Sequence, residues 1–388
     1  MSRRRVFLYV QHLLGIGHLK RAATLAQALI DLGSEVTLAS GGPEVSGFVP
    51  RQAHFVQLPS AAAADPGFKK LVDAQGGEVD EGWRNRRREA LLEAWRFARP
   101  HALVLELFPF GRRQMRFELL PLLEEAIAAS PRPLIVSSVR DVLGQRDPAR
   151  QDEMIALFER YFDRVLVHGD PAFLTFDRTF RHAERLGGRL CYTGYIVDRM
   201  PALQAESRAG AGEVIVSAGG GAVGSELLQA AICARPLTVL AARTWRVLTG
   251  VNIAAQSFDR LAGLAAEAGE GRVVVERSRA DFRTLLQNSF LSVSQAGYNT
   301  IVEILDAGAR AVVVPFSGGK ETEQTLRARL LAARGRIEVV EEAALAPETL
   351  AAAVDRAVQG PKPGGSEVDL GGARKSAELL AQWMAERE

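Results

Sequence analysis

The chain has 388 residues, 47% hydrophobic and 24% charged, which is the balance of a soluble globular protein with about two domains. Its 48 basic and 46 acidic side chains nearly cancel, which argues against nucleic-acid binding, since that normally needs a far more basic face. Two cysteines, Cys191 and Cys233, cannot build a disulfide framework, and no Cys/His cluster has zinc-ligand spacing, so we expect a reduced, cytoplasmic protein.

The chain starts with basic residues followed by apolar ones, which superficially resembles a signal peptide. The apolar run is only Val6 to Val10, and no convincing small-x-small cleavage site follows it. No apolar stretch approaches the roughly 18 to 20 residues that a membrane helix requires. We therefore expect this run to be the first buried strand.

In the first half, short apolar runs alternate with longer amphipathic ones. Runs continuous in Val, Ile and Leu predict strands that are buried on both faces, hence a parallel sheet covered by helices. The predicted strands are Val6–Gln11, Glu35–Ala39, His54–Gln57, Ala102–Glu106, Leu134–Ser137 and Arg164–His168. The predicted helices are Leu19–Leu32, Arg84–Ala98, Phe117–Ala129 and Asp152–Tyr161.

The second half repeats the pattern after residues 201–212, whose small, polar, non-periodic sequence is typical of a linker. We therefore predict two α/β domains, residues 1–200 and 213–388. The predicted strands of the second are Glu213–Ser217, Leu237–Leu240, Arg272–Val275, Leu291–Ser294, Ala311–Pro315 and Arg336–Val340. Its predicted helices include Ser225–Ala234, Ile253–Ala268, Ala280–Gln287, Thr300–Ala307 and Thr322–Ala333.

The first motif is GIGH, Gly15 to His18, between the first predicted strand and its helix. Gly15 and Gly17 allow a tight turn and a close ligand approach, and the helix would direct its N-terminal N–H groups at that ligand. Taken alone, the motif is more typical of an ordinary strand-to-helix turn. His18 favours a site, because an imidazole at the carboxyl end of a parallel strand can serve as a base near neutral pH.

The second motif, Ser217 to Leu228, also joins a strand to a helix. Its glycines suit a loop whose backbone N–H groups hold a diphosphate: Gly219, Gly220, Gly221 and Gly224. It is not a dinucleotide GxGxxG fingerprint at the chain start, and no lysine follows it as in an ATPase P-loop.

The third motif spans Ser292 to Ala328 and predicts a strand, a glycine turn, a helix, a strand, a loop and a further helix. Glu303 on the first of these helices can accept both hydroxyl hydrogens of a ribose. Gln324, beside Glu323 on the second, can donate to and accept from sugar hydroxyls. The alternative is that these are ordinary solvated helix residues.

This third segment resembles the donor-binding region of family 28 glycosyltransferases, notably the type that adds N-acetylglucosamine to the peptidoglycan lipid intermediate. Ten positions match the family pattern in order: Ser294, Ala296, Gly297, Thr300, Glu303, Gly308, Pro315, Glu323, Gln324 and Ala328. The GIGH turn is similar to the family's first glycine loop, which usually has one more glycine. The segment Ser217–Gly224 is similar to the family's phosphate loop. The segment Cys191–Asp198 resembles the family's Thr-Gly segment. ELFPFGRR (Glu106–Arg113) and SSVRDVLG (Ser137–Gly144) are shared with a bacterial group known only as predicted glycosyltransferases.

The resemblance implies an α/β GT-B fold with two facing, doubly wound Rossmann-like domains and a cleft between them. It implies that residues 1–200 bind the acceptor and residues 213–388 the nucleotide sugar, with a final helix near 373–386 packing back on the first domain. The expected activity is inverting transfer from a UDP-linked sugar to an acceptor hydroxyl on a lipid or saccharide.

The expected site residues follow from these motifs. His18 is the candidate base, and Asp141 is the alternative. The donor would be bound by Gly17, Ser217, Gly219, Gly220, Gly221, Gly224, Ser294, Gly297, Thr300, Glu303, Lys320, Glu321, Glu323 and Gln324. The acceptor would be bound by Gly15, Glu106 and Arg140, with a hydrogen-bonded structural carboxylate as the alternative for Glu106. No Asp-x-Asp element is present, so we expect no metal ion and no cofactor.

The segment from Gly82 to Arg116 is rich in arginine and contains Trp83 and Trp95. It could rest on an anionic membrane surface, which would suit a lipid acceptor. A solvated helix face with buried tryptophans is the alternative. The sequence is also compatible with two other functions on the same fold: a nucleotide-sugar epimerase or hydrolase, or a non-catalytic nucleotide-sugar-binding protein.

Overall fold

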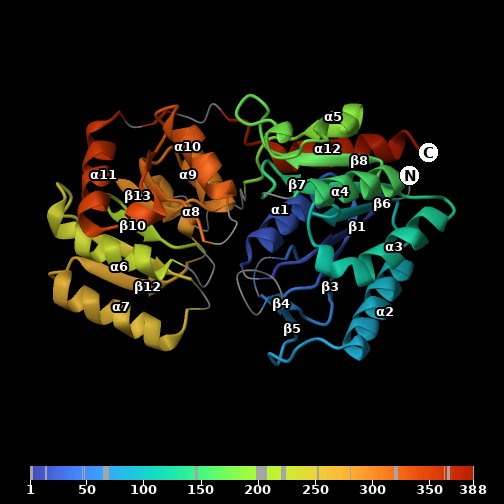
Figure 1. The fold of residues 1–388 in the computed structure, drawn as a ribbon, viewed down its shortest axis with the longest axis horizontal. Helices are drawn as coiled ribbons and strands as arrows, with labels where there is room; N and C mark the ends of the chain where they lie inside the picture. Colours follow the sequence, from blue (N-terminus) through green and yellow to red (C-terminus); the bar gives the residue numbers. More distant parts are fainter. Residues whose placement is uncertain are drawn as a thin grey trace. The chain divides into compact units, whose positions relative to one another are not determined.

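The computed structural model divides into two compact units. It describes residues 3–13, 15–45, 47, 49–63, 70–144, 147–197, 208–219, 224–250, 253–279, 281–318, 322–361, 363–364 and 368–387. The first unit consists of Met1–Asp198 and Val368–Glu388, and the second of Arg199–Glu367. The predicted linker, residues 201–212, therefore falls in the second unit, and its first part lies outside the described residues. Each unit is built around one parallel sheet (Figure 1).

The sheet of the first unit has the order β3-β2-β1-β6-β7-β8-β9. Its strands are β1 (Arg5–Val10), β2 (Glu35–Ser40), β3 (His54–Gln57), β6 (Ala102–Glu106), β7 (Leu134–Arg140), β8 (Arg164–His168) and β9 (Leu190–Tyr192). Every pair of neighbours in it is parallel. The order runs outward in both directions from β1 and β6, so the topological switch point of this Rossmann-like sheet lies between these two strands.

Helices cover both faces of this sheet. Alternate residues of β1 point to opposite faces: Val6, Leu8 and Val10 join the core under α1 (Gly17–Asp31), while Phe7 and Tyr9 join the core on the other side. That other side is covered by α2 (Glu81–Ala98), α3 (Arg116–Ala128) and α4 (Pro148–Tyr161). A short helix, α5 (Ala183–Leu186), and an antiparallel pair, β4 (Ala62–Ala63) with β5 (Leu71–Val72), complete the unit.

The last helix, α12 (Gly372–Ala385), belongs to the first unit although it follows the second in sequence. Its buried residues Ala377, Leu380, Trp383 and Met384 join the core that contains Val6 and Leu8. In Figure 1 this red helix lies among the blue and green elements of the first unit. The second unit therefore ends at Glu367 rather than at the end of the chain.

The second unit has the sheet order β12-β11-β10-β13-β14-β15, again parallel throughout. Its strands are β10 (Val214–Ser217), β11 (Trp245–Thr249), β12 (Val273–Arg277), β13 (Leu291–Gln295), β14 (Ala311–Val314) and β15 (Glu338–Val339). Its helices are α6 (Ser225–Ala234), α7 (Ala255–Ala268), α8 (Phe282–Asn288), α9 (Tyr298–Ala307), α10 (Glu323–Ala332) and α11 (Pro347–Gln359). Here the switch point lies between β10 and β13.

One predicted strand, Leu237–Leu240, is wrong. Residues Arg235–Leu237 form a 3₁₀ turn around Pro236, which cannot donate to a sheet ladder, and Val239 is 66% exposed. The strand of the sheet is β11, which begins eight residues further on, and its second residue, Arg246, interrupts the apolar pattern. The Arg246 guanidinium donates to Glu213 at 2.6 Å and to Glu276 at 2.9 Å, which makes a charged residue compatible with this strand.

The Arg- and Trp-rich segment does not form one continuous surface. Trp83 and Trp95 lie in the hydrophobic core, and Arg87 and Arg112 are also buried. The predicted membrane-facing segment thereby loses its aromatic anchors, and the alternative of a helix with buried tryptophans is the one observed. Among the described helices, none is long and apolar enough to cross a membrane.

Candidate functional site

The switch point of the first unit carries the predicted base. His18 is the second residue of α1, whose N-terminus follows β1, and Glu106 is the last residue of the neighbouring β6. Because β1 and β6 are parallel, their carboxyl ends lie at the same edge of the sheet. The fold thus brings together two residues that are 88 positions apart in the sequence.

The His18 imidazole is held by the Glu106 carboxylate, with 2.6 Å between Nδ1 and Oε1. Burial raises the pKa of Glu106, but His18, Arg21 and Arg112 lower it by more, so this pKa lies well below its usual range. Because the carboxylate is ionised, Nδ1–H donates to it, and Nε2 keeps the lone pair that can accept a proton. Glu106 therefore orients His18, which agrees with the alternative of a hydrogen-bonded carboxylate, although His18 was not predicted as its partner.

His18 is neutral in this environment. Burial lowers the pKa of His18 to about 3; Glu106 opposes this effect, while Arg112 and Arg140 add to it. The side chain is nevertheless 20% exposed, so the ring is not sealed off. A neutral, oriented and accessible imidazole is able to accept a proton, and its lowered pKa makes it a weaker base than a free imidazole.

Two buried arginines share the Glu106 carboxylate. Arg21, one turn after His18 on α1, donates to Oε1, and Arg112 places Nη2 3.8 Å from Oε2. Arg21 was not among the predicted site residues, although its i+3 spacing from His18 on the predicted helix was a usable signal. Arg112 was predicted to belong to the surface segment between Gly82 and Arg116.

A tight turn directs Arg112 back to Glu106. Leu107 and Arg112 both have positive φ, 65° and 59°, conformations that non-glycine residues rarely adopt. Between them, Gly111 has no room for a side chain, because a Cβ there would lie 2.8 Å from the Leu107 side chain. Such strained backbone is typical of functional sites.

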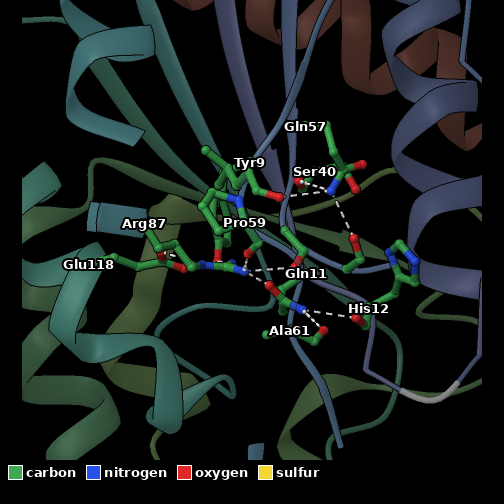
Figure 2. A network of polar contacts seen from close by, with 12 residues as sticks. Tyr9, Gln11, His12, Ser40, Gln57, Pro59, Ala61, Arg87 and Glu118 are labelled. Atoms are coloured by element: carbon green, nitrogen blue, oxygen red, sulfur yellow. Dashed lines mark hydrogen bonds and ion pairs between the residues drawn. The ribbon is translucent and has the colours of Figure 1, made fainter. Parts of the chain in front are cut away.

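A buried network fixes the loops that follow β1, β2 and β3 (Figure 2). Arg87 of α2 is fully buried and donates to both carboxylate oxygens of Glu118, at 2.7 and 2.9 Å. Its remaining donors reach the Gly41 carbonyl at 2.7 Å, the Pro59 carbonyl at 2.6 Å and the Gln11 amide oxygen at 2.5 Å. One side chain therefore ties together the segments that follow β1, β2 and β3.

Gln11 connects the Arg87 network to the loop of the GIGH motif. Its amide nitrogen donates to the His12 carbonyl at 2.9 Å and to the Ala61 carbonyl at 3.0 Å (Figure 2). Gly15 lies in this loop, and Gly17 is the first residue of α1. A Cβ at Gly15 would meet nothing within 4 Å, so the backbone there is open to approach.

Arg140 and Asp141 lie at the end of β7, two strands from β1. The positive charge of Arg140 contributes to lowering the pKa of both His18 and Arg112. Asp141 is fully buried; its Oδ1 accepts from the Val142 N–H at 2.9 Å and its Oδ2 from the Tyr195 hydroxyl at 2.8 Å. These bonds occupy both carboxylate oxygens and favour a structural role over that of a base.

The second unit gathers the predicted donor residues at its own switch point. Ser217, the last residue of β10, and Ser294, the last but one of β13, are direct neighbours in the parallel register of these strands. Gly219 and Gly224 adopt positive φ of 76° and 101°, and a Cβ at Gly224 would lie 2.6 Å from that of Ala218. Gly224 caps the start of α6, so this turn requires its glycines.

The helices after β13 and β14 carry the remaining donor candidates. Gly297 precedes α9, on which Thr300 and Glu303 are buried. Glu323 and Gln324 start α10, and the Gln324 amide oxygen accepts the Phe316 N–H at 3.0 Å, which fixes the loop after β14. The other candidates lie outside the described residues: Gly220, Gly221, Lys320 and Glu321.

Residues 218–369 match the family model of the glycosyltransferase family 28 C-terminal domain. The chain has the GT-B fold, and most of its second unit resembles the family 28 C-terminal domain. The resemblance and the fold predicted from the sequence are thereby confirmed.

One curated relative is the UDP-N-acetylglucosamine–N-acetylmuramyl-(pentapeptide) pyrophosphoryl-undecaprenol N-acetylglucosamine transferase of Granulibacter bethesdensis. It is 26% identical over 135 residues, and the match spans 35% of this chain and 35% of the relative. The similarity in sequence is therefore confined to about a third of that enzyme.

Solved structures resemble this chain over nearly its whole length. The glycosyltransferase of kitacinnamycin gives a TM-score of 0.64 at 17% identity and covers 99% of this chain and 100% of its own. MurG of Acinetobacter baumannii gives 0.57 at 16% identity, with 98% and 99% covered. A UDP-glucosyltransferase of Polygonum tinctorium gives 0.60 at 16% identity, with 100% and 94% covered. At these identities the likeness establishes the fold.

Proposed function

We propose that the protein is a glycosyltransferase that moves a sugar from a UDP-linked donor to an acceptor hydroxyl, with inversion and without a metal ion. The observation that carries this proposal is the carboxylate-held, neutral His18 at the switch point of one unit, in a chain whose other unit matches the family 28 domain. The acceptor is a hydroxyl of a saccharide or lipid bound by the first unit.

In the proposed reaction, the acceptor hydroxyl gives its proton to His18 Nε2 as its oxygen bonds to the anomeric carbon. The bond from that carbon to the donor phosphate oxygen breaks, and the nucleoside diphosphate departs with the electron pair. Glu106 accepts a hydrogen bond from Nδ1 and stabilises the imidazolium that forms. Direct displacement by the acceptor inverts the anomeric configuration.

The donor is proposed to bind at the switch point of the second unit. Backbone N–H groups of the loop that starts at Gly219 and of the α6 N-terminus would stabilise the departing diphosphate as fixed dipoles. Glu303, buried on α9, would accept the ribose hydroxyls. A thermal-shift screen against nucleotide diphosphate sugars tests this donor class, since a ligand of the folded state raises its apparent stability.

The proposed ribose contact predicts a specific loss of affinity. Glu303→Ala should weaken UDP binding by about 1 to 3 kcal/mol, the range for losing a hydrogen bond to a charged group. Isothermal titration calorimetry measures this change, and Glu267→Ala, at an exposed position of the same unit, is the control. Equal affinities in wild type and Glu303→Ala would remove Glu303 from the nucleotide site.

Metal independence gives a second prediction. Because the glycine turn and helix dipole are proposed to stabilise the diphosphate, transferase activity should remain complete in excess chelator. The rate is measured before and after chelation, then again after adding magnesium or manganese. Activity that disappears with chelator and returns with the ion would contradict the proposal.

The same fold also hosts nucleotide-sugar epimerases and hydrolases, and an assay without acceptor separates them. A transferase should consume the donor only when acceptor is added, whereas steady consumption without acceptor would favour a hydrolase or epimerase.

A further inference from the structure

The two oxygens of the Glu106 carboxylate face different partners. Oε1 accepts a hydrogen bond from His18 and another from Arg21. Oε2 is buried without a hydrogen-bond partner among the residues that the structure describes, and Nη2 of Arg112 lies 3.8 Å from it. Because this distance is too long for a hydrogen bond, Arg112 acts on the far side of Glu106 through its charge.

The position of Arg112 is unfavourable for stability. Its side chain is 8% exposed, and its Nε and Nη2 atoms are buried without a hydrogen-bond partner in the described part of the chain. A buried guanidinium that lacks hydrogen bonds destabilises a protein. Its backbone φ of 59° is also unfavourable for a residue other than glycine. Such a combination is typical of a residue that serves function rather than stability.

A fixed positive charge at this place changes the proton balance of His18. A carboxylate beside an imidazole normally favours the protonated ring, because the imidazolium and the carboxylate attract each other. Here the pKa of His18 nevertheless falls to about 3: burial lowers it most, Glu106 raises it, and Arg112 lowers it more than Arg140 does. The charge of Arg112 therefore offsets part of the attraction between His18 and Glu106, while their hydrogen bond remains.

The charged groups that act on His18 come from four parts of the first unit: Glu106 of β6, Arg112 of the turn after β6, Arg140 of β7 and Arg21 of α1. Arg21 shares Oε1 with His18, so it also holds the carboxylate in place. His12 and His168, which lie near Glu106, are neutral at pH 7, because burial lowers the pKa of both. Arg112 is thus the charge that can be removed while the hydrogen bonds of Glu106 are kept.

We propose that Arg112 is a positioning residue of the reaction: its charge, held on the far side of Glu106, keeps His18 unprotonated, so that the ring can accept the proton of the acceptor hydroxyl. This inference rests on the proposed function and adds a residue to it. The turn of residues 107–112 fixes the charge in this place, because Gly111 lets the backbone pass directly against the Leu107 side chain.

The test follows the protonation of His18 in the full chain by NMR of the histidine rings, without any substrate. In the wild type at pH 5, about one molecule in a hundred should carry the proton. Arg112→Gln removes the positive charge and should raise the pKa of His18 by about one unit or more, so the protonated fraction at pH 5 should rise at least about tenfold. An unchanged fraction in Arg112→Gln would overturn the proposal.

Three further variants separate the charge of Arg112 from its packing. Arg113→Gln is the matched control, because Arg113 is the next residue and its side chain is 62% exposed; it should titrate like the wild type, and an equal rise in it would contradict the proposal. Arg112→Lys keeps a positive charge and should leave His18 unprotonated at pH 5, whereas a rise equal to that of Arg112→Gln would exclude the charge as the cause. Arg112→Met repeats the measurement with an unbranched apolar side chain. If neither Arg112→Gln nor Arg112→Met gave a folded protein by circular dichroism, Arg112 would be a stabilising residue and the proposal would fail.

The pH dependence of turnover links this effect to the proposed function. The acid limb of kcat/KM, measured from about pH 4 to 7, should move to higher pH in Arg112→Gln by as much as the pKa of His18. A limb that stays in place while the NMR titration moves would overturn the assignment of Arg112 to the reaction, and with it the role of His18 as base. Calorimetry with UDP tests the donor site separately. Absence of UDP binding would count against the proposed function and leave the NMR result intact, whereas UDP binding without any shift of His18 would overturn only the inference on Arg112.

Discussion

His18→Ala should lower turnover by about 10² to 10⁴-fold, the usual contribution of a positioned general base. Nε2 is the free acceptor on a ring whose other nitrogen is held by Glu106, and alanine provides no substitute. Affinity for UDP should change little, because the proposed donor contacts lie in the second unit. Steady-state kinetics at saturating donor and acceptor measure the loss, and calorimetry with UDP measures the affinity.

Asp141→Asn serves as the matched comparison for His18→Ala. Asparagine keeps a carbonyl that can accept the Tyr195 hydroxyl or the Val142 N–H, so this variant should retain most of the activity. Near-normal turnover in His18→Ala, together with a large loss in Asp141→Asn, would transfer the role of base to Asp141.

The protonation of His18 can be followed directly. With its pKa lowered to about 3, the imidazole should keep its NMR chemical shifts from pH 8 down to pH 5, where only about one molecule in a hundred is protonated. The resonance is identified by its absence in His18→Ala. A titration near the ordinary pKa of 6.5 would show that the ring is more hydrated than its burial indicates.

Arg87→Met should destabilise the first unit by about 3 to 5 kcal/mol, because it leaves the fully buried Glu118 carboxylate without its ionic partner. The segments held at Gly41 and Pro59 lose their anchor at the same time. Urea unfolding followed by tryptophan fluorescence suits this test, because Trp83, Trp95 and Trp383 lie in the first unit and only Trp245 in the second.

Arg86→Met is the control for Arg87→Met. Arg86 is exposed on the same helix, so its replacement should change stability by no more than about 0.5 kcal/mol. Replacing the whole pair, Arg87→Met with Glu118→Leu, should recover much of the loss, because it leaves no buried charge. If Arg87→Met were as stable as Arg86→Met, the hydrogen bonds of Arg87 would not contribute to the stability of the first unit.

Much of the fold could be predicted because buried parallel strands are locally encoded. His54–Gln57, Ala102–Glu106 and Arg164–His168 were predicted with their observed bounds, and α6 likewise. The glycine turns could be found because Gly219 and Gly224 adopt conformations that few other residues tolerate. In contrast, β11 escaped detection because the charge of Arg246 is compensated by residues from outside its own strand.

The partners within the site could not be predicted, for the same physical reason. The role of Glu106 depends on the pairing of β1 with β6, and that of Arg87 on Glu118 in another helix. Neither contact leaves a periodic signal in the sequence. Arg112 was placed at the surface because arginine is mostly exposed in proteins, whereas the turn from Leu107 to Arg112 directs its side chain inward.

The position of α12 also bears on the order in which the protein folds during synthesis. The core of the first unit stays open along α1 until Leu380, Trp383 and Met384 have been made. At ordinary elongation rates the ribosome needs on the order of 10 to 30 s to add the intervening second unit. During that interval the nascent chain exposes the apolar strip that α12 later covers, so chaperones or neighbouring nascent chains have time to bind it.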